Sequence, residues 1–295
     1  MSLVINHNMM AMNANRNLGT AYNALATSVQ RLSSGLRVNS AADDAAGLAI
    51  RELMRAEIAG LNQGIRNAND AISLIQTADG ALQIIDEKLI RMKELAEQAA
   101  TGSYNSDQRL MIESEYQQMA SEITRIANAT DFNGLKLIDG SLSGAHDGSE
   151  LKAKGELKVH FGTGNDSAED YYYIKIDEAT SSALGLGNSS NIAEAGYTVS
   201  TQEAAQKSLV AINDAIISKD KIRAHLGALQ NRLENTISNL QIQAENVQAA
   251  ESRISDVDVA TEMTNFVRNQ ILTQAAVAML GQANSLPQMA MQLIG

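Results

Sequence analysis

The chain has 295 residues, of which 23 are basic and 34 acidic, and its formal net charge of −11 argues against a nucleic-acid-binding surface. It contains no cysteine, which excludes disulfides, thiol nucleophiles and cysteine-ligated metals, and a single proline, Pro287, which permits long uninterrupted helices. Aromatic residues are only 3% of the total and tryptophan is absent, so we expect narrow seams between helices rather than a thick globular core.

The amino-terminal segment, residues 1–44, is predicted to form a nearly uncharged helix, since no acidic residue precedes Asp43. Its apolar residues alternate steps of four and three, which is a heptad pattern, at Leu18, Tyr22, Leu25, Val29, Leu32 and Leu36. Residues 1–10 have neither a basic region nor a continuous apolar stretch, so we expect no cleaved signal peptide. No segment of the chain is long and apolar enough to predict a transmembrane helix.

Residues 45–130 carry the strongest periodic signal and are expected to form the amino-terminal part of a helical rod. The seam has one slip near Ile75 and consists of Met54, Ile58, Leu61, Ile65, Ala68, Ile72, Ile75, Ala78, Leu82, Ile85, Leu89, Met92, Ala96 and Ala99. Gly80 lies inside this run, and a bend there is an open alternative because glycine costs about 1 kcal/mol relative to alanine in a helix. A second helix is expected after residues 101–103, with Ile112, Tyr116, Met119, Ile123 and Ile126 on its apolar face.

Residues 131–200 have a different character, with frequent Gly, Ser, Asp and Asn. Leu157, Val159 and Phe161 alternate with polar residues, and residues 171–176 offer a second strand. Residues 162–170 between them are rich in turn formers, so the two segments predict a β-hairpin. The sequence Phe132-Asn133-Gly134 indicates a second tight turn.

Two further helices are expected after this region. Residues 201–255 form the carboxy-terminal rod helix, with Leu226, Leu229, Leu233, Ile237, Leu240, Ala244, Val247 and Ile254 on its seam. Residues 256–295 form a terminal helix without charge after Arg268, for which one interpretation of the seam is Met263, Phe266 or Val267, Ile271, Ala275, Met279 and Ala283. The predicted fold is therefore mainly α: a long coiled-coil-like helical rod with paired terminal helices and a small mid-chain β-hairpin region.

The sequence offers little support for an enzyme, a cofactor site or a metal site. The four histidines share no metal-ligand spacing, and no zinc-protease, nucleophile-elbow or P-loop motif occurs. Gly162 and Gly164 lie in the predicted hairpin loop and lack the third glycine of a dinucleotide fingerprint. Asp256, Asp258 and Glu262 lack the glycine and spacing of a calcium loop, so we interpret these acids as a solvated helix face or a helix start.

The two uncharged ends admit two interpretations. They can pair simply to complete the core of the monomer, or they can stay disordered alone and fold when neighbouring subunits supply the missing surface. The loss of charge favours the second interpretation, because an exposed helix of a monomer normally keeps charges for solubility. We therefore expect self-association through both ends.

Several segments resemble the signatures of bacterial flagellins. At the amino end these are RLSSGLRVNSAADDAAG from Arg31, RNAND from Arg66 and QTADGAL from Gln76. At the carboxy end they are AESRISDVD from Ala250, ILTQA from Ile271 and QANSLPQ from Gln282. The resemblance covers about residues 1–140 and 200–295. It implies a motility filament subunit, exported unfolded by a flagellar type III apparatus with a chaperone, and assembled outside the cell between hook-associated and cap proteins.

The resemblance also suggests a receptor site. The segment recognised by Toll-like receptor 5 in some flagellins is similar to residues 90–98, where Arg91 and Leu95 match, together with Glu115 on the next helix. Lys93 and Glu97 depart from the commonest pattern. The alternative is an ordinary Arg/Glu helix face with Leu95 in the seam.

We therefore predict a structural, non-enzymatic subunit that needs no cofactor, nucleic acid or membrane. Polymerisation is expected to depend on Leu18, Leu25, Leu32, Leu36, Ile271, Met279, Leu280 and Leu286. One alternative is a hook–filament junction protein with flagellin-like ends, which does not extend indefinitely. A soluble signalling coiled coil is a second alternative, but it requires charges beside the seam throughout, and the uncharged ends count against it.

Overall fold

The computed structural model describes residues 7–148, 155–167, 169–187 and 196–294, and for residues 286–288 and 290–294 it describes the backbone alone. The chain divides into two compact units. We call residues 1–58 with 245–295 the terminal unit, and residues 59–244 the rod unit. No helix among the described residues is long and apolar enough to cross a membrane.

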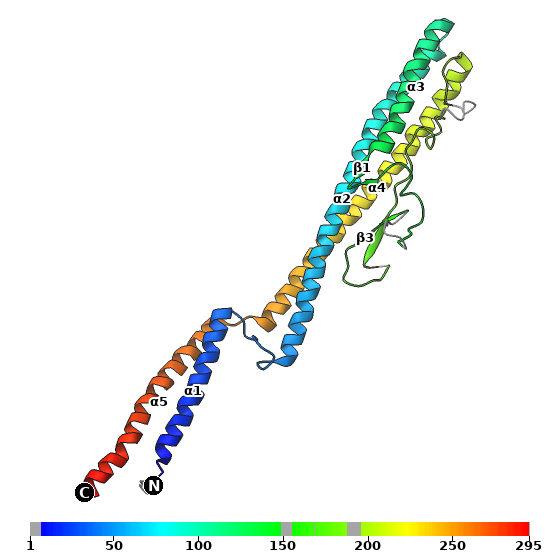
Figure 1. The fold of residues 1–295 in the computed structure, drawn as a ribbon. Helices are drawn as coiled ribbons and strands as arrows, with labels where there is room; N and C mark the ends of the chain where they lie inside the picture. Colours follow the sequence, from blue (N-terminus) through cyan, green and yellow to red (C-terminus); the bar gives the residue numbers. More distant parts are fainter. Residues whose placement is uncertain (1–6, 149–154, 168, 188–195, 295) are drawn as a thin grey trace. The chain divides into compact units, whose positions relative to one another are not determined.

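The helices are α1 (Met9–Ser34), α2 (Ala45–Ala100), α3 (Ser106–Ala129), α4 (Gln202–Ser255) and α5 (Val259–Ile294), as Figure 1 shows. The strands, all short, are β1 (Asp131–Phe132), β2 (Leu135–Lys136), β3 (Leu157–His160) and β4 (Tyr171–Ile174). These elements confirm the predicted fold class of long helices with a small β region. Helix α2 runs through Gly80 without interruption.

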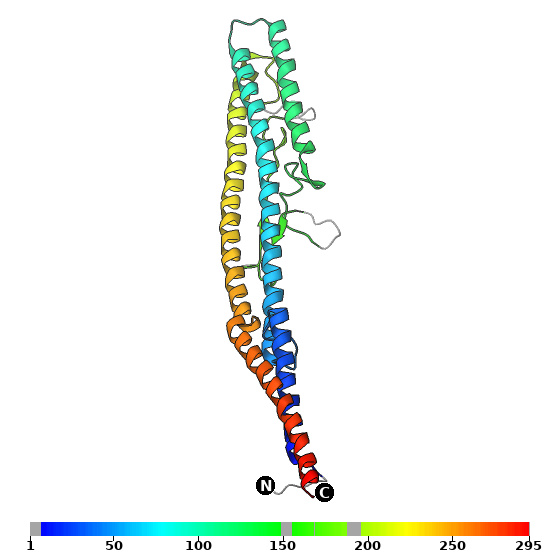
Figure 2. The ribbon, with the colours of Figure 1, turned by 90° about the vertical axis from the view of Figure 1, so that its left-hand side faces the viewer.

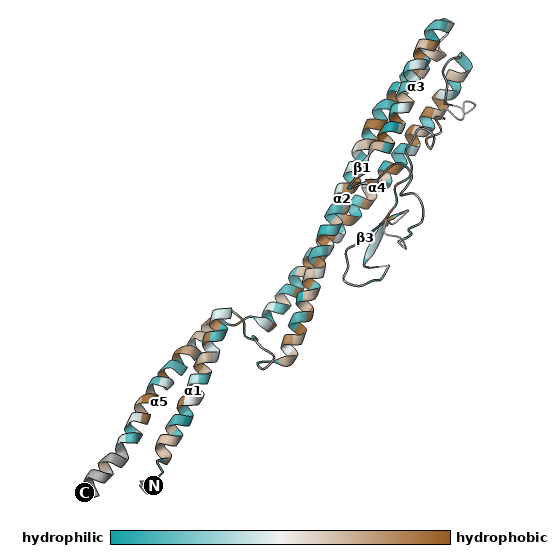
Figure 3. Cartoon of the chain, in the orientation of Figure 1, coloured by the Kyte–Doolittle hydropathy of each residue, from teal (hydrophilic) through white to brown (hydrophobic). Residues whose placement is uncertain are grey.

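The core of the rod unit lies between α2, α3 and α4, which run side by side in Figures 1 and 2. Leu82, Ile85, Leu89 and Met92 of the predicted seam are 0% exposed. Coloured by hydropathy, these helices alternate apolar and polar turns along their length (Figure 3). The amino terminus of α3 is held by a reciprocal capping box, in which the side chain of Asn105 accepts from the N–H of Gln108 and the side chain of Gln108 accepts from the N–H of Asn105.

Both predicted hairpins are present. Strands β1 and β2 pair antiparallel around Asn133 and Gly134, whose φ angles of 51° and 78° suit the Asn-Gly turn. Strands β3 and β4 pair with Val159 opposite Tyr172, and the carbonyl of Asp170 accepts from the N–H of Phe161 to close the loop.

The β3–β4 hairpin lies directly on α2. The side-chain amide of Asn67 donates to the carbonyl of His160 at 2.7 Å. Gly64 faces the next carbonyl so closely that a Cβ atom on it would lie 1.9 Å from the Phe161 oxygen. On the side of α4, the guanidinium of Arg232 lies 3.5 Å from the ring centroid of Tyr172. The absence of a side chain at Gly64 therefore permits the contact between helix and hairpin.

Candidate assembly surface of the terminal helices

Helices α1 and α5 of the terminal unit pair along their length. Each helix covers a stripe of residues with heptad spacing against the other helix, and only some of these residues are the predicted ones. On α1 the covered residues include Ala14, Leu18, Ala21, Leu25, Ser28 and Leu32, and on α5 they include Glu262, Phe266, Asn269, Thr273, Ala276, Leu280 and Ala283. The predicted positions Leu18, Leu25, Leu32 and Leu280 are thus half-buried within the pair, and Leu36 is half-buried just beyond it.

Several other large residues of the predicted seams are exposed. Tyr22 and Val29 on α1 are 63% and 48% exposed, and Met263, Ile271 and Met279 on α5 are 45%, 59% and 63% exposed. The stripe between the helices combines small and polar residues with Leu18, Leu25, Leu32, Phe266 and Leu280. The exposed large apolar side chains lie outside this contact.

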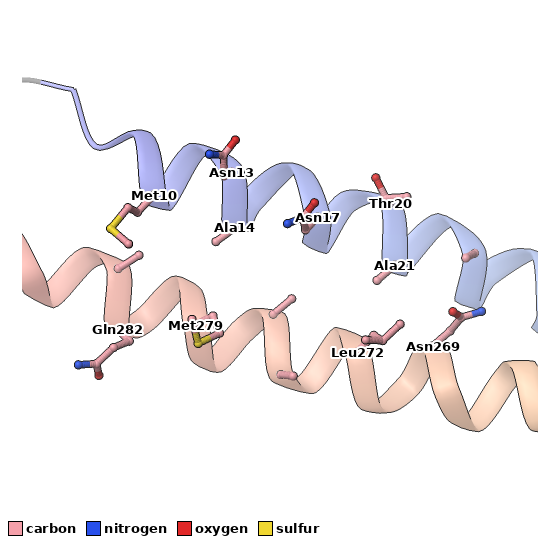
Figure 4. A pocket seen from close by; sticks show the side chains of 14 residues that line it. Met10, Asn13, Ala14, Asn17, Thr20, Ala21, Asn269, Leu272, Met279 and Gln282 are labelled. Atoms are coloured by element: carbon pink, nitrogen blue, oxygen red, sulfur yellow. The ribbon is translucent and has the colours of Figure 1, made fainter. Parts of the chain in front are cut away.

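A groove of about 690 Å³ lies between the two helices. Its walls are mostly Ala, Asn, Thr and Met side chains, with Met10 and Met279 near one end and Leu272 farther along (Figure 4). Neither wall carries a charged residue. Together with the exposed apolar rows, the groove gives the terminal unit an apolar and uncharged surface that a soluble monomer rarely exposes.

The segments that follow α1 and precede α5 are joined by backbone hydrogen bonds. Gly35 ends α1 in a left-handed conformation with φ 72°. The N–H of Arg37 donates to the carbonyl of Ser255 at 2.7 Å, and the N–H of Val257 donates to the carbonyl of Gly35 at 3.0 Å. The guanidinium of Arg37 also donates to the carbonyl of Ile254 at 2.8 Å. These bonds tie the two chain ends together at the base of the helix pair.

The acidic residues before α5 mark a helix start, as predicted. The carboxylate of Asp258 accepts from the N–H of Ala260 at 3.0 Å and from the hydroxyl of Thr261 at 2.8 Å, which lowers the pKa of Asp258 below its ordinary value. Asp256 accepts from the hydroxyl of Ser252. Within the described residues, no group of three His, Asp or Glu side chains is placed to hold a metal ion.

One ionic contact links the terminal helices. A nitrogen of the Arg31 guanidinium lies 3.7 Å from a carboxylate oxygen of Glu262, whose side chain is 9% exposed. The signature around Arg31 therefore includes a residue that contacts the opposite end of the chain. Sequence periodicity missed this pair because it follows apolar residues, and both partners are charged.

The three residues of the predicted receptor site lie in the rod unit. Arg91 and Glu115 form an ion pair at 2.7 Å between α2 and α3, and the hydrogen bonds that the Arg91 guanidinium donates to Glu115 and Glu94 raise the pKa of Arg91. Their side chains are 48% and 44% exposed. Leu95 is 1% exposed and belongs to the core between the helices, so it has no free surface for a partner in this structure.

Paired terminal helices with an apolar surface, joined to a helical rod, define the class of protein to which the chain belongs: a long helical protein built from both of its chain ends. The comparison with known proteins identifies the family. The bacterial flagellin N-terminal helical region matches residues 5–143 and the bacterial flagellin C-terminal helical region matches residues 209–294. The chain belongs to the bacterial flagellin family.

The relatives resemble the chain over its whole length. It is 40% identical to flagellin FlaB2 of Treponema pallidum over 292 residues, which is 99% of this chain and 100% of the relative. It is 42% identical to a flagellin of Halalkalibacterium halodurans over 293 residues, with 99% and 100% coverage. A solved structure from Vibrio parahaemolyticus, assigned as a flagellar hook-associated protein, aligns with a TM-score of 0.56 and 17% identity over 72% of this chain and 100% of the other, which supports the fold alone.

Proposed function

We propose that the chain is the repeating subunit of an extracellular flagellar filament and has a structural, non-catalytic role in motility. In this proposal residues 1–44 and 256–295 form the inner tube of the filament, residues 45–130 and 201–255 form the rod, and residues 131–200 form the variable outer region. The observation that carries the proposal is the uncharged, apolar surface of α1 and α5. Neighbouring subunits would bury this surface.

The residues expected to drive polymerisation fall into two groups. Ile271 and Met279 are exposed and are available to contact a neighbouring subunit directly. Leu18, Leu25, Leu32, Leu36 and Leu280 are half-buried in the terminal unit, so we assign them to holding α1 against α5. The side chain of Leu286 lies outside the described part of the chain, and its assignment rests on the sequence alone.

Seeded polymerisation of purified monomer, followed by light scattering and electron microscopy, tests this function. We expect long filaments that keep growing from seeds, whereas a hook–filament junction protein would stop after a few subunits. Deletion of the last 20 residues should leave a helical monomer that no longer polymerises. Continued polymerisation after this deletion would refute the terminal-assembly proposal.

A finer variant tests the exposed row itself. Replacing Ile271 and Met279 together by serine removes two large apolar side chains. Each of them contributes about 1.5–3 kcal/mol to the free energy of association when a neighbouring subunit buries it. The critical concentration should therefore rise at least about a hundredfold. The matched control is Met111→Ser on α3, which removes a side chain that is 73% exposed but lies in the rod unit. An equal rise in the critical concentration of both variants would contradict a specific role of the terminal helices.

Export and end-capping partners follow from the same surface. We propose that the chain leaves the cell through the flagellar type III apparatus, and that a chaperone covers the apolar rows of α5 before assembly, since exposed apolar rows promote aggregation. Hook-associated and cap proteins would contact the equivalent surfaces at the two filament ends. A chaperone complex that is unchanged by truncation of α5 would contradict the first of these assignments.

Recognition by Toll-like receptor 5 is proposed through Arg91 and Glu115, whose exposed ion pair supports the assignment. Leu95 would act only by keeping α2 packed, because it is buried. Replacing Arg91 and Glu115 by alanine should reduce receptor signalling. The control replaces Glu122 and Arg125, another exposed pair at 2.7 Å, and unchanged signalling in the first variant would refute the proposal.

A further inference from the structure

A charged side chain occupies a core position of the rod unit between α2 and α4. Along α4, buried residues recur at more than one heptad position, and one such series consists of Ala205, Ile212, Lys219, Leu226, Leu233 and Leu240. Lys219 is the only charged member of the series, yet it is 1% exposed. Its Nζ lies 2.5 Å from a carboxylate oxygen of Asp86 on α2 and 2.8 Å from one of Asp220.

A second ion pair crosses between the same helices one turn away. The Nε of Arg223 lies 2.7 Å from a carboxylate oxygen of Asp79, and hydrogen bonding to this carboxylate raises the pKa of Arg223. Asp79 and Asp86 are one heptad apart on α2. Arg223, the later residue on α4, pairs with Asp79, the earlier residue on α2. The two helices are therefore antiparallel, and the two ion pairs follow one another along their interface.

The apolar residues of the rod unit do not by themselves select one alignment of α2 and α4. Ile75, Leu82 and Leu89 recur every seven residues, as the α4 series does. A slide by one heptad, which is about 10 Å along the axis, would therefore again place apolar side chains opposite apolar side chains. The repeat of the apolar positions therefore does not by itself identify the native register.

The charged residues distinguish these registers. A slide in one direction would bring Lys219 level with Lys93, which has the same charge. A slide in the other direction would bring Arg223 level with Ile72, which cannot pair with it. Each shift would thus break one of the two pairs and replace the other, since Arg223 would meet Asp86 in the first case and Lys219 would meet Asp79 in the second. In the first case Lys219, which is 1% exposed, would face Lys93 and keep only Asp220 of its own helix, and a buried charge with incomplete pairing is unfavourable.

We propose that the Lys219–Asp86 and Arg223–Asp79 pairs are a register lock, which sets the axial alignment of α2 against α4. A single polar residue at a core heptad position is known to specify register at a cost in stability. The lock would give every copy of the rod unit the same alignment and hence the same outer surface. This conformational role is separate from the assembly surface of the terminal helices.

The alignment can be measured by pulsed electron resonance between two spin labels on the full-length monomer. The chain has no native cysteine, so labels can be placed at the exposed positions Gln83 on α2 and Asn235 on α4 after their replacement by cysteine. In the otherwise unchanged protein we expect one distance. In the variant Lys219→Leu with Asp86→Ala, Asp79→Ala and Arg223→Ala, we expect an additional distance shifted by about 10 Å.

Two further variants complete the test. Replacing Lys219 and Asp86 both by asparagine keeps a polar pair in the core and should retain the single native distance. Replacing Glu203 and Lys207 by glutamine removes a pair within α4 alone, joined at 2.8 Å, and should also change nothing. A single native distance in the apolar variant, loss of its helical circular dichroism, or two distances in the asparagine variant would each overturn the register lock.

Discussion

The contact between α2 and the β3–β4 hairpin predicts opposite effects for the same substitution at two glycines of one helix. In Gly64→Ala the new Cβ would lie 1.9 Å from the carbonyl oxygen and 2.7 Å from the carbonyl carbon of Phe161. Both atoms belong to the backbone, so the hairpin itself must move away from the helix. In Gly80→Ala the new Cβ meets no atom within 4 Å.

The size of the Gly64→Ala effect follows from what the displacement disturbs. Overpacking costs about 1–3 kcal/mol, and weakening the 2.7 Å bond from Asn67 to His160 costs about 0.5–1.5 kcal/mol. Alanine regains about 1 kcal/mol through its helix propensity. We therefore expect the free energy of unfolding to fall by about 1–3 kcal/mol, which lowers Tm by about 2–12 °C.

Urea denaturation of the monomer, followed by circular dichroism, measures both variants. Gly80→Ala is the matched control and should raise the free energy of unfolding by about 0.5–1 kcal/mol, because it gains helix propensity without a clash. The reasoning is refuted if Gly64→Ala is as stable as Gly80→Ala, since the hairpin would then not rest on the bare backbone of α2.

Three other predictions concern single side chains. Leu95→Ala should destabilise the monomer by about 2–5 kcal/mol and Arg91→Ala by less than about 1 kcal/mol, and equal losses on urea denaturation would contradict the burial of Leu95. Burial raises the pKa of the Tyr116 hydroxyl, so the contribution of this group to stability is fully present below about pH 10 and is lost as the pH rises further. An ultraviolet titration in which all tyrosines ionise together, before the protein unfolds, would contradict the raised pKa of Tyr116. Because the pKa of Asp258 is lowered, the contribution of this carboxylate to stability is present above its ordinary pKa near 3.9 and is lost as the pH falls. Asp258→Asn should therefore reduce the loss of thermal stability that acid causes, as measured by thermal unfolding.

The helical elements of the rod unit could be predicted because their apolar pattern repeats over many turns. The residues from Leu82 to Met92 that the pattern placed in the seam are buried, and Asn133-Gly134 forms the tight turn that its backbone preferences predict. The same reasoning failed in the terminal helices. Tyr22 and Ile271 lie outside the pair because the contact between α1 and α5 is made by a different stripe, in which small and polar residues alternate with leucines.

This failure has a physical cause that also bears on function. Periodicity reports that a helix has an apolar face, but it does not report whether that face meets the same chain or another subunit. The sequence predicts Ile271 and Met279 both as seam positions and as assembly positions, and both side chains are exposed on the terminal unit. A residue cannot easily serve both contacts, and only the packing of α1 against α5 separates them.

The sequence by itself determined the helical class, the order of the elements, the absence of charge at the chain ends and the resemblance to flagellins. These properties depend on local preference and on repeats that persist over many residues. The tertiary structure decided which stripe of each terminal helix is covered, that Gly64 receives a backbone carbonyl, and that Lys219 is buried against Asp86. Each of these depends on a pair of residues far apart in the chain, whose meeting no local pattern encodes.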